Sequence, residues 1–95
     1  MNIPLTTWRK LIAEELAVNG ESWDDVIRCN VRHPGRDGPG LDVEFYDGYG
    51  GRRGSPFTAW TAARVYFPAV HDGKEWCASV PRNPCDETVE HVGGE

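Results

Sequence analysis

The sequence predicts an α+β fold in which one N-terminal helix packs on an antiparallel sheet of four to five strands. Three observations support this prediction. Apolar residues follow a helical spacing in residues 7–18, apolar and polar residues alternate in several short segments after them, and the turn sequence Asp72-Gly73 separates two such segments. The 95 residues suit a single domain over 1–95, in which 81–95 is expected to be an extended acidic tail.

The helix is expected over about residues 7–18, because its apolar side chains share one face and its charged side chains point away from that face. The apolar face is made of Trp8, Leu11, Ile12 and Leu16. Thr6 or Thr7 can cap the first turn, and Gly20 can end the helix. An apolar helix face of this kind needs a sheet to lie on.

The segments that follow the helix switch from the helical period to a period of two. Ser22 and Asp25 form a capping-box pattern that predicts one helical turn, and residues 27–32 and 41–46 then alternate apolar and polar side chains. We expect these two strands to pair antiparallel across the loop 33–40, because this pairing places the arginines of the first beside the carboxylates of the second. The apolar residues of the first strand are Ile27, Cys29 and Val31, and the charged residues in question are Arg28, Arg32, Asp42 and Glu44.

The clearest local signal is a hairpin centred on Asp72-Gly73, a sequence typical of a type I′ turn. This turn fixes the register, and a slip of one residue would move every side chain to the other face. The resulting pairs are His71–Lys74, Ala69–Trp76, Phe67–Ala78 and Val65–Val80, and all but the first are apolar on both strands. Pro68 falls opposite Cys77, and its missing N–H predicts an edge or a bulge on the far side of that strand.

A further strand is predicted over residues 56–61, where Phe57 and Ala59 fall on one face and Thr58 and Trp60 on the other. We expect several aromatic side chains to lie on the sheet face away from the helix, opposite Phe45, Ala59 and Phe67. These aromatic residues are Tyr46, Trp60 and Tyr66. They are either exposed to water or covered by the acidic tail.

The segment Asp47–Trp60 is rich in glycine, arginine and aromatic residues. Its residues 51–54 fit the GXXG pattern with which KH domains approach an RNA backbone, but here the neighbouring segments are predicted strands. It also lacks the Gly-Lys-Ser/Thr ending of a phosphate-binding loop. The segment is therefore either a flexible connection with solvated arginines, a nucleic-acid contact that uses Arg36, Arg52 and Arg53 with Tyr49, or a mobile tip that recognises a protein.

The charge balance limits the classes of partner. A net charge of -5 argues against general affinity for nucleic acid, because neutralising phosphates requires clustered basic residues. The same charge suits an acidic surface that meets a basic surface on a partner. The first 20 residues contain no apolar run long enough for a signal peptide or a membrane span, so we expect a cytoplasmic protein.

The sequence contains no recognisable catalytic motif, so we expect neither enzyme activity nor a cofactor. The histidines and cysteines at positions His71, Cys77, Cys85 and His91 are of the right types for zinc, but they lack the close pair that structural zinc sites use. Three cysteines without paired spacing do not form a disulfide framework, and Cys29 is expected in the core.

Several stretches of the chain resemble a group of short proteins from phages and prophages. They are SWDDV, LDVEFYDGYGG, PFTAWT, VYFPAVHDGKEW, CASVPRNP and HVGGE, and the resemblance covers the chain from Trp8 to its end, apart from a longer glycine-rich loop at His33–Gly40. The resemblance implies an accessory phage protein. Small acidic phage proteins often bind and block a host protein, and anti-CRISPR proteins are the best-known kind.

The combined expectation is a non-enzymatic binding protein that inhibits a host protein or nucleoprotein complex. It would use an acidic and aromatic surface, without direct nucleic-acid binding and without membrane contact. The residues assigned to this surface are Asp42, Glu44, Tyr46, Asp47, Tyr49, Arg52, Arg53, Trp60 and Tyr66. The alternatives are a small nucleic-acid-binding module that uses the glycine- and arginine-rich loop, and a virion-assembly component.

The cysteine and histidine spacing leads to a first prediction. The purified protein should contain no stoichiometric zinc, and unfolding it without reductant should release all three thiols. Metal analysis and a thiol assay measure these two quantities. Bound zinc, or fewer than three thiols per chain, would contradict the prediction.

Overall fold

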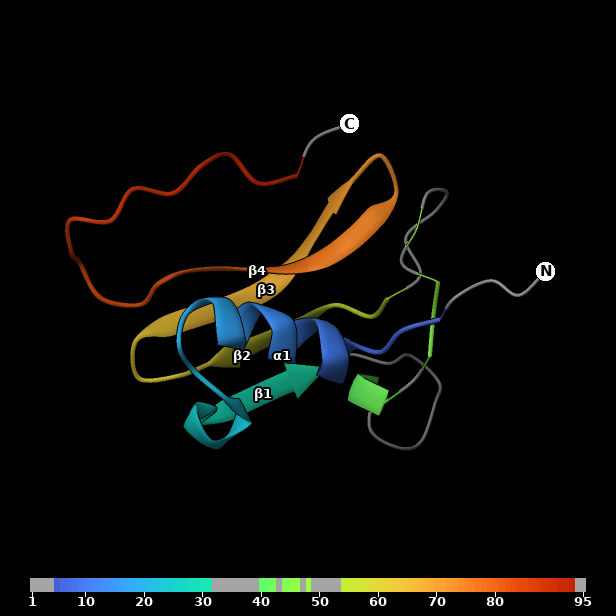
Figure 1. Cartoon of the computed structure of the whole chain (residues 1–95), viewed down its shortest axis with the longest axis horizontal. Helices are drawn as coiled ribbons and strands as arrows, with labels where there is room; N and C mark the ends of the chain where they lie inside the picture. Colours follow the sequence, from blue (N-terminus) through green and yellow to red (C-terminus); the bar gives the residue numbers. More distant parts are fainter. Residues whose placement is uncertain (1–4, 32–39, 43, 47, 49–53, 94–95) are drawn as a thin grey trace.

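The computed structural model describes residues 5–31, 40–42, 44–46, 48 and 54–93 (Figure 1). It confirms the predicted α+β fold, with one N-terminal helix packed on an antiparallel sheet whose strand order is β1-β2-β3-β4. The elements in chain order are the helix α1 (Trp8–Val18), the 3₁₀ turn η1 (Trp23–Asp25), β1 (Arg28–Val31), the 3₁₀ turn η2 (Gly40–Asp42), β2 (Phe57–Trp60), β3 (Arg64–His71) and β4 (Lys74–Pro81).

The N-terminal helix has the extent and the buried face that the sequence predicts. Thr7 caps its first turn, where the side-chain oxygen accepts a backbone N–H at 3.2 Å. The chain leaves the helix at Asn19 and turns at Gly20, whose φ of 73° is the left-handed conformation that glycine adopts without strain. The four apolar residues of the predicted face, Trp8, Leu11, Ile12 and Leu16, are all buried. The capping box of Ser22 and Asp25 also forms, at η1.

The strands β3 and β4 form the predicted hairpin in the predicted register. Asp72 and Gly73 have φ values of 52° and 84°, as a type I′ turn requires. The four predicted pairs, His71–Lys74, Ala69–Trp76, Phe67–Ala78 and Val65–Val80, are all present. The turn chemistry and the matched apolar side chains therefore determine the same register.

The predicted pairing of residues 27–32 with 41–46 is wrong. The strand β1 pairs with β2 instead, and Ile27, which was expected on the buried face, precedes β1 and is 65% exposed. Residues 40–42 form a 3₁₀ turn rather than a strand. The β1–β2 pairs run from Arg28–Trp60 through Cys29–Ala59 and Asn30–Thr58 to Val31–Phe57. Arg32 and most of the predicted loop after it lie outside the described residues.

Contacts with the N-terminal region explain why residues 41–46 do not pair with β1. Asp42 forms an ion pair with Arg9 of the helix, at 2.7 Å between Nε and Oδ1. Phe45 forms an isolated β-bridge with Thr6, and its ring packs 5.1 Å from that of Trp8, between centroids. The apolar and polar alternation here thus reflects burial beside the helix, rather than a strand next to β1.

The helix covers the sheet face that carries Tyr66, which corrects the predicted arrangement of the aromatic residues. Directly paired residues share a face, and the paired row across the four strands is Cys29, Ala59, Tyr66 and Ser79. The hydroxyl of Ser79 reaches the carboxylate of Glu15 on the helix at 2.9 Å, so this row faces the helix. Tyr66 is completely buried there, whereas Trp60 is half-buried on the other face, which we call the outer face.

The chain after β4 rounds the end of the sheet and runs back along the hairpin (Figure 1). Its start is fixed by the ion pair between Arg64 and Glu87, in which both carboxylate oxygens accept, at 2.9 and 3.0 Å. Near its end, a hollow of about 350 Å³ is lined by residues of the hairpin, His71, Lys74 and Trp76, and by His91 and Gly93 of the tail. The tail therefore reaches the hairpin end of the outer face. The outer face carries Trp60, Val65, Phe67, Ala69, Trp76, Ala78 and Val80.

The hairpin turn leads to a second prediction. Replacing Gly73 by alanine should lower the free energy of unfolding by about 1 kcal/mol, because alanine is strained at a φ of 84°. Asp72→Asn is the matched control, since asparagine also suits the first position of a type I′ turn. Chemical denaturation of the three proteins measures the effect. Equal losses from both changes would contradict the assigned turn.

Candidate functional site

Among the residues predicted to bind a partner, those that the structure describes do not all lie on one surface. Trp60 lies on the outer face and keeps part of its ring exposed, but Tyr66 is buried under the helix. Of the others, Asp42 and Glu44 are exposed and Tyr46 is partly buried, while Asp47, Tyr49, Arg52 and Arg53 lie outside the described residues. Tyr66 is therefore not available at the surface, whereas Trp60 is partly exposed on the outer face.

Tyr66 instead forms the centre of a buried polar network between the helix end and the sheet. Its hydroxyl donates to Glu21 Oε1 at 2.5 Å, and the hydroxyl of Thr61 donates to the same oxygen at 3.2 Å. The side-chain amide of Asn19 donates to the Tyr66 oxygen at 3.4 Å and to Ser79 Oγ at 3.1 Å. Burial and the Glu21 carboxylate raise the pKa of Tyr66 well above its usual range. These hydrogen bonds connect the helix end to the sheet.

Arg64 extends this network to the tail and borders a second hollow. Its Nε donates to Ser79 Oγ at 2.9 Å, and its two terminal nitrogens bind Glu87. The guanidinium lowers the pKa of the Glu87 carboxyl. The hollow has a volume of about 370 Å³ and is lined by Asn19, Glu21, Ala63, Arg64, Pro81, Asn83, Pro84, Cys85 and Glu87. The hydrogen bonds of Arg64 tie the tail to the sheet. No histidine is among the described residues that line this hollow.

Two of the three cysteine thiols are shielded from water, and the described part of the chain contains no metal-ligand cluster. Burial raises the pKa of the thiols of Cys77 and Cys29, so neither is a thiolate at neutral pH. Cys85 is exposed. Within the described residues, no group of three His, Cys, Asp or Glu side chains could hold a metal ion. No helix in that part of the chain has the length and apolar character needed to cross a membrane.

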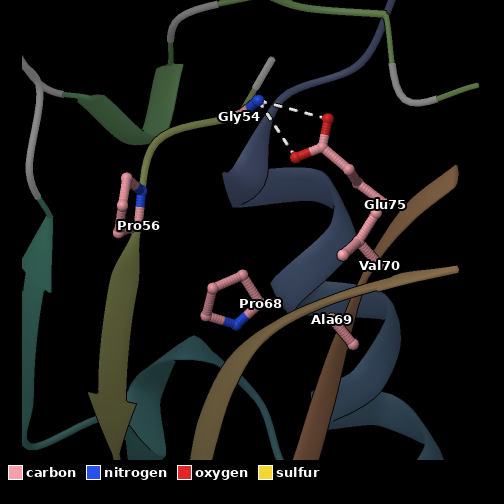
Figure 2. A pocket seen from close by; sticks show the side chains of 6 residues that line it. All are labelled: Gly54, Pro56, Pro68, Ala69, Val70 and Glu75. Atoms are coloured by element: carbon pink, nitrogen blue, oxygen red, sulfur yellow. Dashed lines mark hydrogen bonds between the residues drawn. The ribbon is translucent and has the colours of Figure 1, made fainter. Parts of the chain in front are cut away.

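A hollow of about 410 Å³ lies where β2 and β3 separate (Figure 2). These strands pair only at Ala59–Tyr66 and Trp60–Val65. The next part of β3 contains Pro68, which has no N–H to donate to a neighbouring strand, as the sequence predicts for this side. The hollow is lined by Gly54, Pro56, Pro68, Ala69, Val70 and Glu75. It is mostly apolar, with a single carboxylate among these residues.

The carboxylate of Glu75 is fixed at one side of this hollow, and the residue is only 3% exposed. Both of its oxygens accept the backbone N–H of Gly54, at 3.1 and 3.2 Å, as Figure 2 shows. Gly54 lies against the buried indole of Trp8, where a Cβ would come within 2.7 Å of the ring. The Nε1 of Trp8 is buried, and none of the residues that the structure describes accepts a hydrogen bond from it. Only glycine fits at position 54 without moving the indole.

Sequence reasoning missed Glu75 and Gly54. A signal for Glu75 was present, because it follows the turn in the same alternating row as Cys77 and Ser79, the row that faces the helix. A charged residue in a buried row marks a site with a specific partner. Gly54 gave no such signal, because the sequence does not show which glycine meets Trp8.

Comparison of the chain with known proteins found no matching family model, no matching curated protein and no matching solved structure.

The buried network leads to a third prediction, about tyrosine ionisation. Because the pKa of Tyr66 is raised in the folded state, this phenol should stay protonated above pH 10, where an unfolded tyrosine ionises. The folded state then binds more protons than the unfolded state, so the free energy of unfolding should fall as the pH rises above about 10. Ultraviolet titration of tyrosinate and denaturation at several pH values measure both effects. In the control Tyr66→Phe the late ionisation should be missing. Native tyrosines that all ionise together near pH 10 would contradict the prediction.

Proposed function

We propose that this chain is a non-enzymatic binding protein that inhibits a host protein or nucleoprotein machine. On the resemblance to phage proteins, the proposal takes the specific form of an anti-CRISPR protein that acts in the host cytoplasm. It would occupy a basic, nucleic-acid-binding groove of its target. The observation that supports this proposal best is the partly exposed group of apolar side chains on the outer face.

This group consists of Trp60, Val65 and Phe67, and each keeps part of its surface exposed. Trp60 is paired with Val65 on the next strand, and Phe67 follows on the same face of β3. Adjoining apolar side chains on the surface of a small protein are typical of interaction sites. Aromatic side chains that are partly buried before binding supply rigid anchors with little loss of conformational entropy.

The charge of the chain favours a basic partner. The net charge is -5, and Glu44 and the tail residues Asp86 and Glu90 are exposed carboxylates. Such a charge attracts a basic surface at long range and raises the association rate more than the final affinity. The same charge repels free nucleic acid, which supports a protein or nucleoprotein partner over a bare oligonucleotide.

The fourth prediction tests this function with variants of the outer face. The tagged protein should capture a partner from host lysate, identified by mass spectrometry, and should form a stable complex with that purified partner. Trp60→Ala and Phe67→Ala should each weaken the complex by about 2 kcal/mol or more if these residues are interface anchors. Glu44→Lys should mainly slow association, because it removes a steering charge. Calorimetry and association kinetics measure these changes.

Ile27→Ala is the matched control, because Ile27 is exposed but does not belong to the outer face. Thermal unfolding of each variant separates a loss of binding from a loss of folding. Outer-face variants that bind like the parent would contradict the proposed surface. Tight, salt-dependent binding of an oligonucleotide by the parent would favour a nucleic-acid-binding module, and self-assembly into large particles would favour a virion component.

A further inference from the structure

We infer that the hollow of about 370 Å³ beside Arg64 binds an alkylammonium group, with the carboxylate of Glu21 as its counter-ion. The hollow lies between the end of the helix, the turn from β2 to β3 and the start of the tail, which rounds the sheet at this end (Figure 1). Arg64 and Pro81 are paired residues of the row that faces the helix, so this site is separate from the outer face. The inference therefore goes beyond the proposed function and does not depend on it.

The carboxylate of Glu21 has one oxygen available for a ligand. The hydroxyls of Tyr66 and Thr61 both donate to Oε1, at 2.5 and 3.2 Å, and no described residue donates to Oε2. These two hydrogen bonds fix the carboxylate in advance, so little conformational entropy is lost when a ligand binds. A ligand that brings a charged N–H group would form the stronger, charge-assisted kind of hydrogen bond with Oε2.

The other polar side chains of the lining also present acceptors. The amide nitrogen of Asn83 donates to a backbone carbonyl at 3.4 Å, and that of Asn19 donates to a backbone carbonyl at 3.0 Å. Their Oδ1 oxygens receive no hydrogen bond from the described residues, whereas all three nitrogens of Arg64 already donate. The lining thus offers oxygens from Glu21, Asn19 and Asn83, and an ammonium group has three N–H donors to match them.

The charge of the lining selects a ligand with one positive charge. The described lining residues include two carboxylates, Glu21 and Glu87, and one guanidinium, that of Arg64. One negative charge is therefore in excess, and a single ammonium group balances it. A divalent metal ion would not be balanced, and an anion would be repelled.

The apolar part of the lining indicates that the ammonium group is carried on an alkyl chain. Ala63, Pro81 and Pro84 belong to this part. A small inorganic cation would leave these side chains in contact with water, whereas methylene groups pack against them. Free aliphatic amines and lysine side chains share this chemistry.

The fifth prediction tests the site with butylammonium at constant ionic strength. In the isotope-labelled protein this probe should shift the amide resonances of Ala63 and Cys85 in a saturable way. Butyltrimethylammonium keeps the charge without an N–H group, and butan-1-ol keeps the shape without the charge. Each of these two matched probes should bind at least ten times more weakly, because the site needs both the charge and the N–H donors.

Two variants assign the binding to this hollow. Glu21→Gln keeps an oxygen for Tyr66 but removes the charge, and it should weaken binding of butylammonium at least tenfold. Glu14→Gln is the matched control, because Glu14 is an exposed carboxylate of the helix outside the lining, and it should leave binding unchanged. Asn83→Lys keeps the test valid if Glu21→Gln fails to fold. Asn83 is exposed, so the substitution should preserve the fold, and the new ammonium group should abolish the saturable shifts by occupying the site.

The same titrations contain the results that would overturn the site. These are equal binding of butylammonium and butyltrimethylammonium, shifts that survive Asn83→Lys, and shifts that survive a folded Glu21→Gln. N-acetyl-lysine methylamide, which carries the ammonium group on a peptide backbone, separates the two sources of the ligand. Tighter binding of this probe than of butylammonium supports a lysine side chain of another protein, and weaker binding supports a free amine.

Discussion

The packing of Trp8 is the contact on which the rest of the structure depends. Its indole is 1% exposed and lies against the rings of Phe45 and Phe57, at centroid distances of 5.1 and 4.6 Å. Gly54 covers another part of the same indole. One side chain thereby holds the helix, the segment around Phe45 and the start of β2 together. The position of Gly54 beside Glu75, and with it the shape of the hollow, follows from this packing.

The helix and the hairpin could be predicted from the sequence because their signals are local. Thr7 and Gly20 mark the ends of the helix, and Asp72-Gly73 sets the register of the hairpin. The prediction for residues 41–46 was wrong because two segments with alternating apolar and polar residues, 41–46 and 56–61, could each have paired with β1. Contacts between residues distant in sequence determine which segment pairs with β1, above all the packing of Phe45 on Trp8.

The candidate site was harder to predict than the fold. Both rows of the hairpin contain enough apolar residues to form a core, so periodicity alone does not show which row the helix covers. The helix covers the row with Tyr66 and Ser79 because Glu15, Asn19 and Glu21 supply hydrogen-bond partners for their hydroxyls. The apolar pairs of the hairpin then lie on the outer face, where the described part of the tail borders the end near Trp76.

The short pairing between β2 and β3, with two residue pairs, has a consequence for the order in which the chain folds. The β3–β4 hairpin closes over a two-residue turn and pairs along its whole length, whereas β1 and β2 must close the long segment 32–56. Loop closure costs more entropy for the longer segment, so the hairpin should form early and the β1–β2 pair should dock onto it afterwards. The two residue pairs between β2 and β3 would then be absent from the folding nucleus. Changes at Ala59 or Trp60 should accelerate unfolding more than they slow folding.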